Sequence, residues 1–181
     1  MVLADEYGLI RRRYRQVYEC NLEPSFGTYA HSRRCGETRA QVGYRRATTG
    51  PLFLESYLDR PVEDAVSAAL GRPIGRDSIV EIGNLAADDA FALVQLWAGV
   101  ANDLGATCEV AVATLTAPLR AMFVRLGVPI LELGVAHADR AAGGTDWGSY
   151  YAADPRVCVG SIAQGQSALA AFFARRRSQA A

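Results

Sequence analysis

The stretch Ser78-Ile79-Val80-Glu81-Ile82-Gly83-Asn84-Leu85-Ala86-Ala87-Asp88-Asp89 decides the fold. Its first half is an apolar, β-branched run typical of a buried strand, with one carboxylate, Glu81, inside it. Gly83-Asn84 predicts the end of that strand, and the Asp pair predicts the N-terminus of a helix. A buried strand that carries one charge and leads into a helix is a common way to build a site. Glu81 and the turn after it are therefore the first candidates.

The elements that follow this stretch alternate between helix and strand. Apolar spacing predicts a helix over 89–104, and Gly105 ends it. The run 108–115 predicts a central strand because only Glu109 interrupts its apolar residues. The remaining expected elements are a helix from 116 or 117 to 126, strands at 129–133 and 156–159, and a C-terminal helix at about 161–177.

The elements that precede the stretch are a helix, a hairpin and a helical insertion. Residues 8–20 place Leu9, Tyr14, Val17 and Tyr18 at roughly helical spacing. Two strand-like runs at 26–33 and 38–47 predict an antiparallel hairpin. The insertion at about 50–72 is expected to hold two short helices, 52–58 and 62–70.

This order predicts an α/β (α+β) fold. We expect a mixed central sheet, in which a hairpin joins a β-α-β-α-β unit, flanked by helices on both faces. The length of 181 residues and the absence of a long linker predict a single domain over 1–181.

The charge of the chain is balanced overall but unevenly distributed. The net charge is zero, which argues against a general nucleic-acid binder. Residues 1–46 hold nine Arg and five acids, whereas 47–174 hold seven Arg and fourteen acids. The last seven residues add Arg175-Arg176-Arg177, and these two basic ends favour an acidic protein partner, or they are simply solvated faces. All 19 basic residues are Arg, which is typical of a codon bias.

The cysteines and the hydropathy indicate a cytoplasmic protein. The four cysteines form no C-x-x-C pair and the chain has two His, so no metal site is expected. No signal peptide precedes the first expected helix, and no apolar run reaches about 18 residues. We therefore expect reduced thiols, no transmembrane segment and a cytoplasmic location. A homo-oligomer is possible.

Four ordered blocks of the sequence resemble the thermostable haemolysin family. They are Leu52-Phe53-Leu54-Glu55-Ser56-Tyr57-Leu58-Asp59, residues 79–86, Leu119-Arg120-Ala121-Met122-Phe123-Val124-Arg125-Leu126-Gly127-Val128-Pro129, and Trp147-Gly148-Ser149-Tyr150-Tyr151. The resemblance spans about 10–162 and implies an architecture similar to the Gcn5-related N-acetyltransferase fold.

A weaker likeness connects the chain to the acyl-homoserine-lactone synthases. Arg45, then Thr48-Thr49-Gly50-Pro51, then Val80-Glu81-Ile82-Gly83-Asn84 is similar to their arginine, Thr-Thr-Gly-Pro and Glu-x-x-Arg sequence. Arg15-Gln16-Val17-Tyr18 is similar to their early Arg-x-x-Phe. Asn84 stands where those enzymes have arginine, and their early Trp and acidic pair have no counterpart. The likeness implies an acyltransferase scaffold and a substrate-binding role for Arg15 and Arg45, and it leaves the acceptor open.

The resemblance also implies where an acyl donor binds. In acetyltransferase-like folds the strand at Glu81 separates from its parallel neighbour, here 108–115, and the pantetheine arm of a thioester lies in the gap. Leu85, Ala86 and Thr114 are then donor-binding residues. No tightly bound cofactor is expected, since the thioester of coenzyme A or of a carrier protein is a co-substrate.

The turn at Leu85-Ala86-Ala87-Asp88-Asp89 separates the possible donors. Family members that use coenzyme A usually have a glycine-rich basic turn there, whereas this turn has no Gly, no Arg and two acids. Two carboxylates beside a pyrophosphate would repel it. The Asp pair is better explained as an N-cap and a match to the helix dipole. The donor is thus an acyl group on an acidic carrier protein, or the scaffold no longer uses a thioester.

Each candidate side chain has a chemical and a structural interpretation. Glu81 is either a general base for an amine, with its pKa raised by burial, or the ion-pair partner of Arg45 on the adjacent strand. Asn84 either polarises a carbonyl oxygen or takes the left-handed turn position that Asn tolerates.

The aromatic cluster at 147–151 and Arg120 also have one chemical and one structural interpretation each. Trp147, Tyr150 and Tyr151 either form the wall of a pocket, with one hydroxyl as a proton donor, or pack under a long loop. Arg120 either binds an anion or pairs with a carboxylate on a strand.

Three classes of function follow from the sequence. The preferred one is an acyltransferase that moves an acyl group from a thioester to the amine of a small molecule, possibly an amino acid or an S-adenosylmethionine-derived acceptor. The alternative is a non-catalytic partner protein that keeps the fold and has lost the donor site. Membrane lysis is the third, and the C-terminal helix with Arg175-Arg176-Arg177 is its best candidate segment.

Overall fold

The computed structural model describes residues 6–141 and 146–180. Within these residues the helices are α1 (Gly8–Tyr18), α2 (Val62–Leu70), α3 (Ala90–Leu104), α4 (Ala117–Leu126) and α5 (Ile162–Ala180). The strands are β1 (Thr28–Arg34), β2 (Glu37–Arg46), β3 (Ile79–Ala87), β4 (Val110–Leu115), β5 (Leu131–Val135) and β6 (Arg156–Ser161). Short 3-10 turns are η1 (Ala47–Thr49), η2 (Phe53–Tyr57), η3 (Arg76–Ser78), η4 (Ala138–Arg140) and η5 (Tyr150–Ala153).

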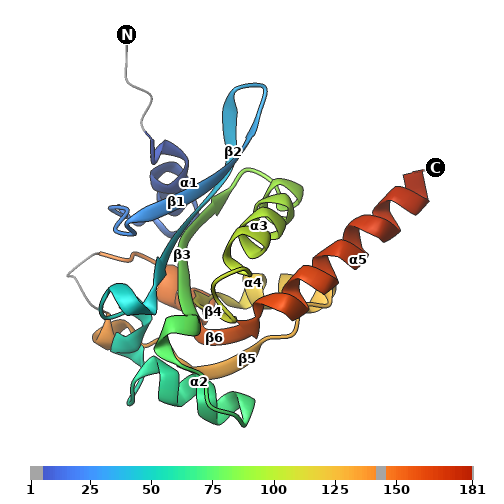
Figure 1. Ribbon diagram of the computed structural model, residues 1–181. Coiled ribbons are helices and arrows are strands. Elements are labelled where there is room, and N and C mark those ends of the chain that lie inside the picture. The colour runs from blue at the N-terminus through green and yellow to red at the C-terminus, as the bar shows by residue number, and fades with distance from the viewer. Residues whose placement is uncertain (1–5, 142–145, 181) are drawn as a thin grey trace.

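The described strands form one mixed sheet of six strands in the order β1-β2-β3-β4-β6-β5. β3 and β4 are parallel, and the other neighbouring strands are antiparallel. One face packs against the insertion and α2, and the opposite face packs against α3 and the start of α5 (Figure 1). The expected fold class, a mixed sheet with helices on both faces, is confirmed, and β4 is central as its apolar run predicts.

β3 continues through Gly83-Asn84, so the predicted strand break at this position is wrong. Gly43 pairs with Gly83 and Gln41 pairs with Ala86, which means that β3 holds one residue more than β2 between these pairs. This is a β-bulge, and Asn84 is in the left-handed region with a φ of 49°. Asn tolerates that conformation better than most residues, so the dipeptide marks a bulge and not an end. The helix start is confirmed, because the Asp89 side chain accepts a hydrogen bond from Ala92 N.

The bulge lies where β3 separates from its parallel neighbour. β3 pairs with β4 only from Ile79–Val110 to Ile82–Ala113. Beyond these pairs β3 stays with β2 as far as Ala87, whereas β4 stays with β6 as far as Leu115. A bulge bends its strand and increases the local twist. The two strands therefore diverge toward their C-terminal ends and leave a gap in the sheet.

Two details of the predicted helices are corrected. The predicted helix at 52–58 is the 3-10 turn η2, in which Leu52 N donates to the Glu55 carboxylate at 2.8 Å. Val17 is 49% exposed, because Ile10 and Tyr14, four residues apart, form the buried stripe of α1 and Val17 lies beside it. The second predicted helix of the insertion is α2, with the bounds that the sequence predicts.

The C-terminal helix α5 is confirmed, and its last turns project away from the sheet (Figure 1). Its first part packs against α3, where Gln166 donates to Ala101 O at 3.1 Å. In the described part of the chain, no helix has both the length and the hydrophobicity to cross a membrane.

Candidate functional site

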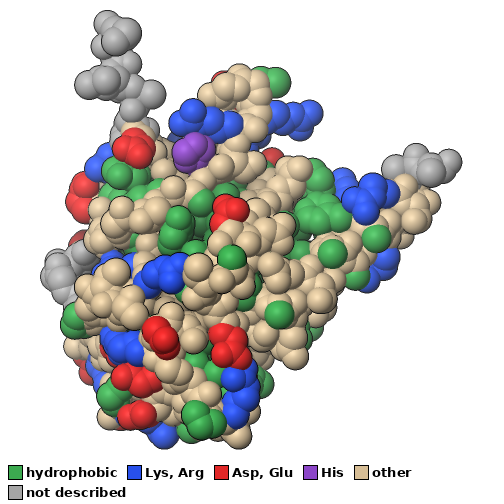
Figure 2. Space-filling model, in the orientation of Figure 1, with side chains coloured by type: hydrophobic (Ala, Val, Ile, Leu, Met, Phe, Trp, Pro, Cys, Tyr) green, Lys and Arg blue, Asp and Glu red, His purple; other side chains and the backbone are tan. Residues whose placement is uncertain are grey.

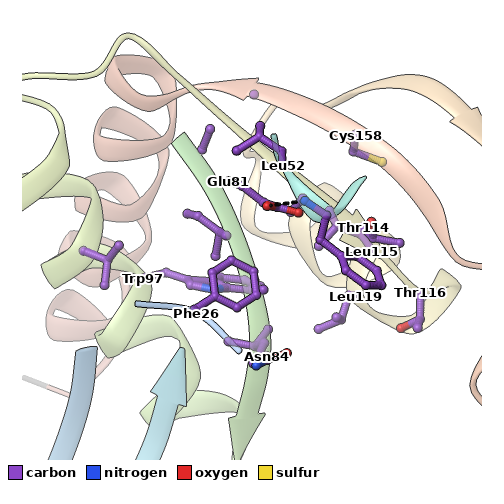
Figure 3. Close-up of a pocket in the computed structure, with 18 of the residues that line it drawn as sticks. Phe26, Leu52, Glu81, Asn84, Trp97, Thr114, Leu115, Thr116, Leu119 and Cys158 are labelled. Carbon is purple, nitrogen blue, oxygen red and sulfur yellow. Dashed lines mark hydrogen bonds between the residues drawn. The ribbon is translucent and has the colours of Figure 1, made fainter. Parts of the chain in front are cut away.

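A cavity of about 670 Å³ occupies the gap between β3 and β4. Its wall includes side chains from both faces of the sheet, as Figure 3 shows for part of it. We call the part near the insertion the polar arm, formed by Arg45, Glu81, Asn84, Thr114, Trp147 and Tyr150. We call the part between the sheet and the helices the apolar arm, formed by Trp97, Ala113, Leu119, Phe123, Gly165 and Leu169.

Glu81 is the most constrained residue of the polar arm. Its carboxylate is 3% exposed and accepts hydrogen bonds from Leu54 N at 2.9 Å and from Phe53 N at 3.0 Å. Burial raises the pKa of this carboxyl above its usual value, and the two backbone donors oppose that shift. Glu81 therefore fixes η2 against the sheet.

Arg45 connects Glu81 to the chain segment before β1. Its Nε lies 3.5 Å from the Glu81 carboxylate, and its guanidinium donates to Ser25 O at 3.2 Å. The same guanidinium stacks on the ring of Phe26 at 4.4 Å. The ion pair that the sequence offers as one interpretation of Glu81 is thus present, and Arg45 faces the cavity.

Phe26 lies against two glycines that face each other on neighbouring strands. A Cβ atom on Gly43 would lie 2.7 Å from Phe26, and one on Gly83 would lie 2.5 Å from its ring. The two glycines thus make the space that the ring occupies. A glycine inside a strand often marks a close approach by another group. Gly43 and Gly83 are therefore the sequence signal for the contact with Phe26.

Asn84 is held at the bulge by a tyrosine from β1. Its amide nitrogen donates to the Tyr29 hydroxyl at 2.9 Å, and that hydroxyl also accepts from Phe26 N at 3.0 Å. Asn84 is 8% exposed and lines the cavity. Its left-handed backbone is one of the two interpretations that the sequence allows, and the bond to Tyr29 uses neither the second amide hydrogen nor the carbonyl oxygen of the side chain.

An aromatic group closes the polar arm. Trp147 and Tyr150 line the cavity with their ring centroids 5.2 Å apart, and Phe53 lies 5.8 Å from Trp147. The buried indole Nε1 of Trp147 has no hydrogen-bond partner among the described residues. Burial raises the pKa of Tyr150 well above its usual value, so its hydroxyl stays protonated.

The apolar arm is bounded by a stacked aromatic pair. Trp97 of α3 and Phe123 of α4 lie with their ring centroids 4.1 Å apart and their planes at 17°. Ala113 and Gly165 contribute walls with little or no side chain, which leaves room between the sheet and the helices. This arm has the shape and polarity of a binding site for an alkyl chain.

The structure brings seven of the eleven predicted site residues to the cavity wall. They are Arg45, Glu81, Asn84, Leu85, Thr114, Trp147 and Tyr150. The backbone of Leu85 forms a hydrogen bond with Tyr14, so Leu85 contributes its side chain to the wall.

The other four predicted site residues lie outside the wall and have structural contacts. Arg15 is exposed and donates to Asn21 at 3.1 Å. Ala86 packs against α1. The Arg120 guanidinium donates to Leu115 O at 2.7 Å and pairs with Asp154 at 2.5 Å, and the Tyr151 hydroxyl lies 2.7 Å from that of Tyr57.

Several wall residues were not singled out from the sequence as site residues. The sequence predicts Trp97 only as an apolar position of a helix and Phe26 only as the start of a strand. Leu119 and Phe123 enter only as part of the block 119–129 that resembles the family. Thr116 is 2% exposed and faces the cavity at the start of α4. Apolar periodicity shows that a residue is buried, but it does not distinguish a core position from the wall of a cavity.

The turn before α3 carries paired charges. Asp88 contacts Arg12 at 2.7 Å and Arg39 at 3.4 Å, and Asp89 caps Ala92 N at 2.8 Å. The formal charges of these two acids and two arginines cancel. No group of three or more His, Cys, Asp or Glu residues in the described ranges has a geometry that could hold a metal ion.

A sequence profile described as "Thermostable hemolysin" matches residues 4–166. The chain belongs to the thermostable haemolysin family. Curated protein sequences contain no significant match to it.

Solved structures share the fold of this family member. TofI, in a ternary complex with an inhibitor and MTA, is 18% identical with a TM-score of 0.59, over 90% of this chain and 88% of that one. FeeM, an N-acyl amino acid synthase from uncultured soil microbes, is 16% identical with a TM-score of 0.57, over 88% and 90%. BjaI, a coenzyme A-dependent acyl-homoserine lactone synthase with SAM and isopentyl-CoA, is 16% identical with a TM-score of 0.54, over 82% and 66%. At these identities the similarity shows a common fold.

Proposed function

We propose that this chain is an N-acyltransferase that moves an acyl group from a thioester to the amine of an amino-acid-type acceptor. The cavity between β3 and β4 carries the proposal, because it joins a charged, hydrogen-bonding arm to an apolar one across the sheet. A reaction that joins a zwitterionic acceptor to an alkyl chain needs both environments in one continuous site. FeeM and BjaI, which share the fold, are named as an N-acyl amino acid synthase and an acyl-homoserine lactone synthase.

The donor lies with its acyl chain in the apolar arm. The edge of β3 beyond Ile82 has no β4 partner, so its backbone groups, apart from the one of Leu85 that bonds to Tyr14, remain available to the thioester and the pantetheine amides. The alkyl chain then passes Ala113 toward the stacked pair of Trp97 and Phe123. Coenzyme A and the phosphopantetheine of a carrier protein share this part of their structure.

The acceptor lies in the polar arm. Arg45 is the only cation on the described wall and binds the carboxylate of the acceptor. The indole N–H of Trp147, which has no partner among the described residues, also donates to that carboxylate. Glu81, beside Arg45, attracts the ammonium group. One positive and one negative group side by side complement a zwitterion.

The transfer itself balances without a further reactant. The acceptor ammonium loses one proton, its nitrogen attacks the thioester carbonyl carbon, a C–N bond forms and the C–S bond breaks. We assign the first proton to Glu81, whose raised pKa suits a base, and Asn84 donates to the carbonyl oxygen. Tyr150 gives its hydroxyl proton to the departing thiolate, and the second proton of the amide nitrogen returns to the Tyr150 oxygen. Glu81 alone then holds an extra proton, which it releases to water.

Mass spectrometry of reaction mixtures tests the proposal. The protein is incubated with dodecanoyl-coenzyme A or a dodecanoyl-carrier protein and with a panel of amines that includes the common amino acids and S-adenosylmethionine. The expected result is acylation of one or a few acceptors, dependent on active protein. The chain contains no lysine, so acylation of its own side-chain amines cannot obscure the product. Absence of any acylated amine with both donors contradicts the proposal.

A non-catalytic partner protein is the second candidate. The turn before α3 favours it, because this turn has no glycine and its own Asp89 already occupies Ala92 N. On that alternative the purified protein transfers no acyl group, and it binds acyl thioesters no better than a variant with a filled apolar arm.

A further inference from the structure

Exposed arginines surround the N-terminus of α3. Arg33 and Arg34 are at the tip of the β1–β2 hairpin, and Arg175, Arg176 and Arg177 are on the last turns of α5. All five are exposed, and none of them has an ion-pair partner in residues 6–141 and 146–180. We call these five residues the basic face. In Figure 2 Arg side chains gather on the hairpin and near the end of α5.

The hairpin and the end of α5 both adjoin the start of α3. Asp88 N donates to Arg39 O of β2 at 2.9 Å, which fixes the turn before α3 to the hairpin. Phe91, in the first turn of α3, is 38% exposed, contacts Phe173 of α5 at 6.0 Å between ring centroids, and lies under the guanidinium of Arg176 at 4.6 Å. Figure 1 shows α3 between the two projecting elements.

This surface adjoins the end of β3 that has separated from β4. β3 and β4 separate after Ile82 and Ala113, and β3 then runs directly to the turn that begins α3. A thioester bound between the two strands has its pantetheine arm directed along that gap. Whatever carries the arm is therefore brought to the N-terminus of α3, with the basic face around it.

The distribution of charge selects between the two possible carriers. A pyrophosphate is a compact anion that needs free backbone N–H groups and a close approach, usually at a glycine-rich turn. Here Asp89 caps Ala92 N, and Arg12 and Arg39 are already paired with Asp88. The uncompensated positive charge lies instead on two separate projections with an exposed phenylalanine between them. This pattern suits a protein surface and not a nucleotide.

We propose that the basic face docks an acidic acyl-carrier protein, which delivers the acyl group to the cavity on its phosphopantetheine arm. This rests on the proposed function and names its donor. The arginines of the hairpin and of α5 contact acidic side chains of the carrier, and Phe91 contacts an apolar residue between them. The transfer is the one written above, and the phosphopantetheine thiol of the carrier is the leaving group.

Charge reversal on the two projections tests the proposal. The variants are Arg33→Glu/Arg34→Glu and Arg175→Glu/Arg177→Glu, and the matched control is Arg60→Glu, an exposed arginine of the insertion without an ion-pair partner among the described residues. The probes are an acidic carrier protein bearing a dodecanoyl group, dodecanoyl-coenzyme A, and dodecanoyl-pantetheine, which lacks both carrier and nucleotide. Binding of the dodecanoyl-carrier is measured by titration calorimetry, and the transfer rates with all three donors are measured.

The expected result is a Kd for the carrier that rises about tenfold or more in each double variant and is unchanged in Arg60→Glu. Added salt weakens binding to the wild type more than to the variants. The rates with dodecanoyl-pantetheine stay the same in all four proteins, which shows that the cavity is intact. Equal carrier binding by all four, or a lower KM for dodecanoyl-coenzyme A than for the carrier, overturns the proposal. If all four proteins bind the carrier equally and still transfer from a small donor, the docking surface is contradicted and the proposed function stands. If the carrier binds but no acyl group is transferred, the proposed function is contradicted and the docking surface stands.

Discussion

The two arms of the cavity are held in different ways. Each charged or amide side chain of the polar arm is bonded to a segment far away in the sequence: Glu81 to η2, Asn84 to β1, and Arg45 to the loop before β1. The apolar arm is shaped by van der Waals contact, as in the stack of Trp97 and Phe123. Directional bonds between distant segments make the polar arm sensitive to single atoms, whereas the apolar arm responds to changes of volume.

The largest expected effect is that of Glu81→Ala on stability. This change removes the acceptors of Phe53 N and Leu54 N and leaves the buried side of Arg45 without its counter-charge. The free energy of unfolding is expected to fall by about 3–5 kcal/mol, measured by urea denaturation. The control is Glu109→Ala, which breaks an exposed pair with Arg72 and is expected to cost less than about 1 kcal/mol. Similar losses in both variants would show that the polar arm is not specially constrained.

The second effect is the acid sensitivity of the insertion that Glu81 anchors. The ion pair with Arg76 lowers the pKa of Glu55 to about 2 from its usual value of 4.5. A lowered pKa contributes stability that is present above about pH 4.5 and is lost as the pH falls toward 2, at most about 3 kcal/mol. The raised pKa of Glu81 has the opposite sign, since stability falls as the pH rises through the usual value of that group.

Glu55→Gln separates these two contributions. Urea unfolding from pH 2.5 to 7 should show a flatter acid limb in the variant than in the wild type. An acid limb of the same steepness in both proteins would assign the pH dependence to other carboxylates.

A methyl group on Gly83 is expected to disturb the polar arm by overpacking. Its Cβ would lie 2.5 Å from the Phe26 ring, which must then move and shift Arg45. We expect Gly83→Ala to lower the free energy of unfolding by about 1–3 kcal/mol and to raise the KM for the acceptor. The matched change Gly99→Ala, in α3 with nothing within 4 Å of the added atom, should stabilise the protein by up to about 1 kcal/mol. Equal effects of the two changes would argue against the contact.

The smallest effect is expected from filling the apolar arm. Gly165 lies on the cavity wall, where a Cβ meets only Val128 at 3.9 Å, so Gly165→Leu extends into the arm. We expect the rate with dodecanoyl donors to fall about tenfold, with little change for butanoyl donors, since each excluded methylene forfeits about 0.8 kcal/mol of burial. The exposed neighbour Ala163→Leu is the control. An unchanged preference for chain length would place the acyl group elsewhere.

Local patterns in the sequence were sufficient for the elements and for the class of fold. Apolar periodicity predicts α3 and α5, Pro118 and Gly127 mark the ends of α4, and the continuous apolar run at 108–115 indicates a central strand, which is β4. Gly83-Asn84 wrongly predicts a strand end because a left-handed residue occurs equally in a turn and in a bulge. Only the pairing of β3 with β2 distinguishes the two. Val17 is exposed although it follows the apolar spacing of α1, because that spacing predicts a buried stripe on the helix but not the exact edge of the stripe.

The sequence predicts part of the wall of the candidate site, and there is a physical reason why it predicts some of these residues and not others. Glu81, Arg45 and Asn84 are polar residues in or beside apolar strands, so the sequence marks them as exceptions. Arg120 and Tyr151 are equally exceptional in sequence, but Asp154 and Tyr57 bind their polar atoms and neither residue reaches the cavity wall. Trp97 and Phe123 carry no such mark, because a wall of a cavity and a packed core have the same apolar composition.

The sequence by itself determined which segments become strands and helices. It also determined that the strand with a single carboxylate, Glu81, leads to the start of a helix. These features depend on residues close together in the chain, through spacing, capping and backbone preference. The tertiary structure decided that the bulge at Asn84 opens a gap beside β4, that Glu81 holds η2, and that two distant basic segments flank the start of α3. These features depend on contacts between segments that are distant in the chain, which no local pattern specifies.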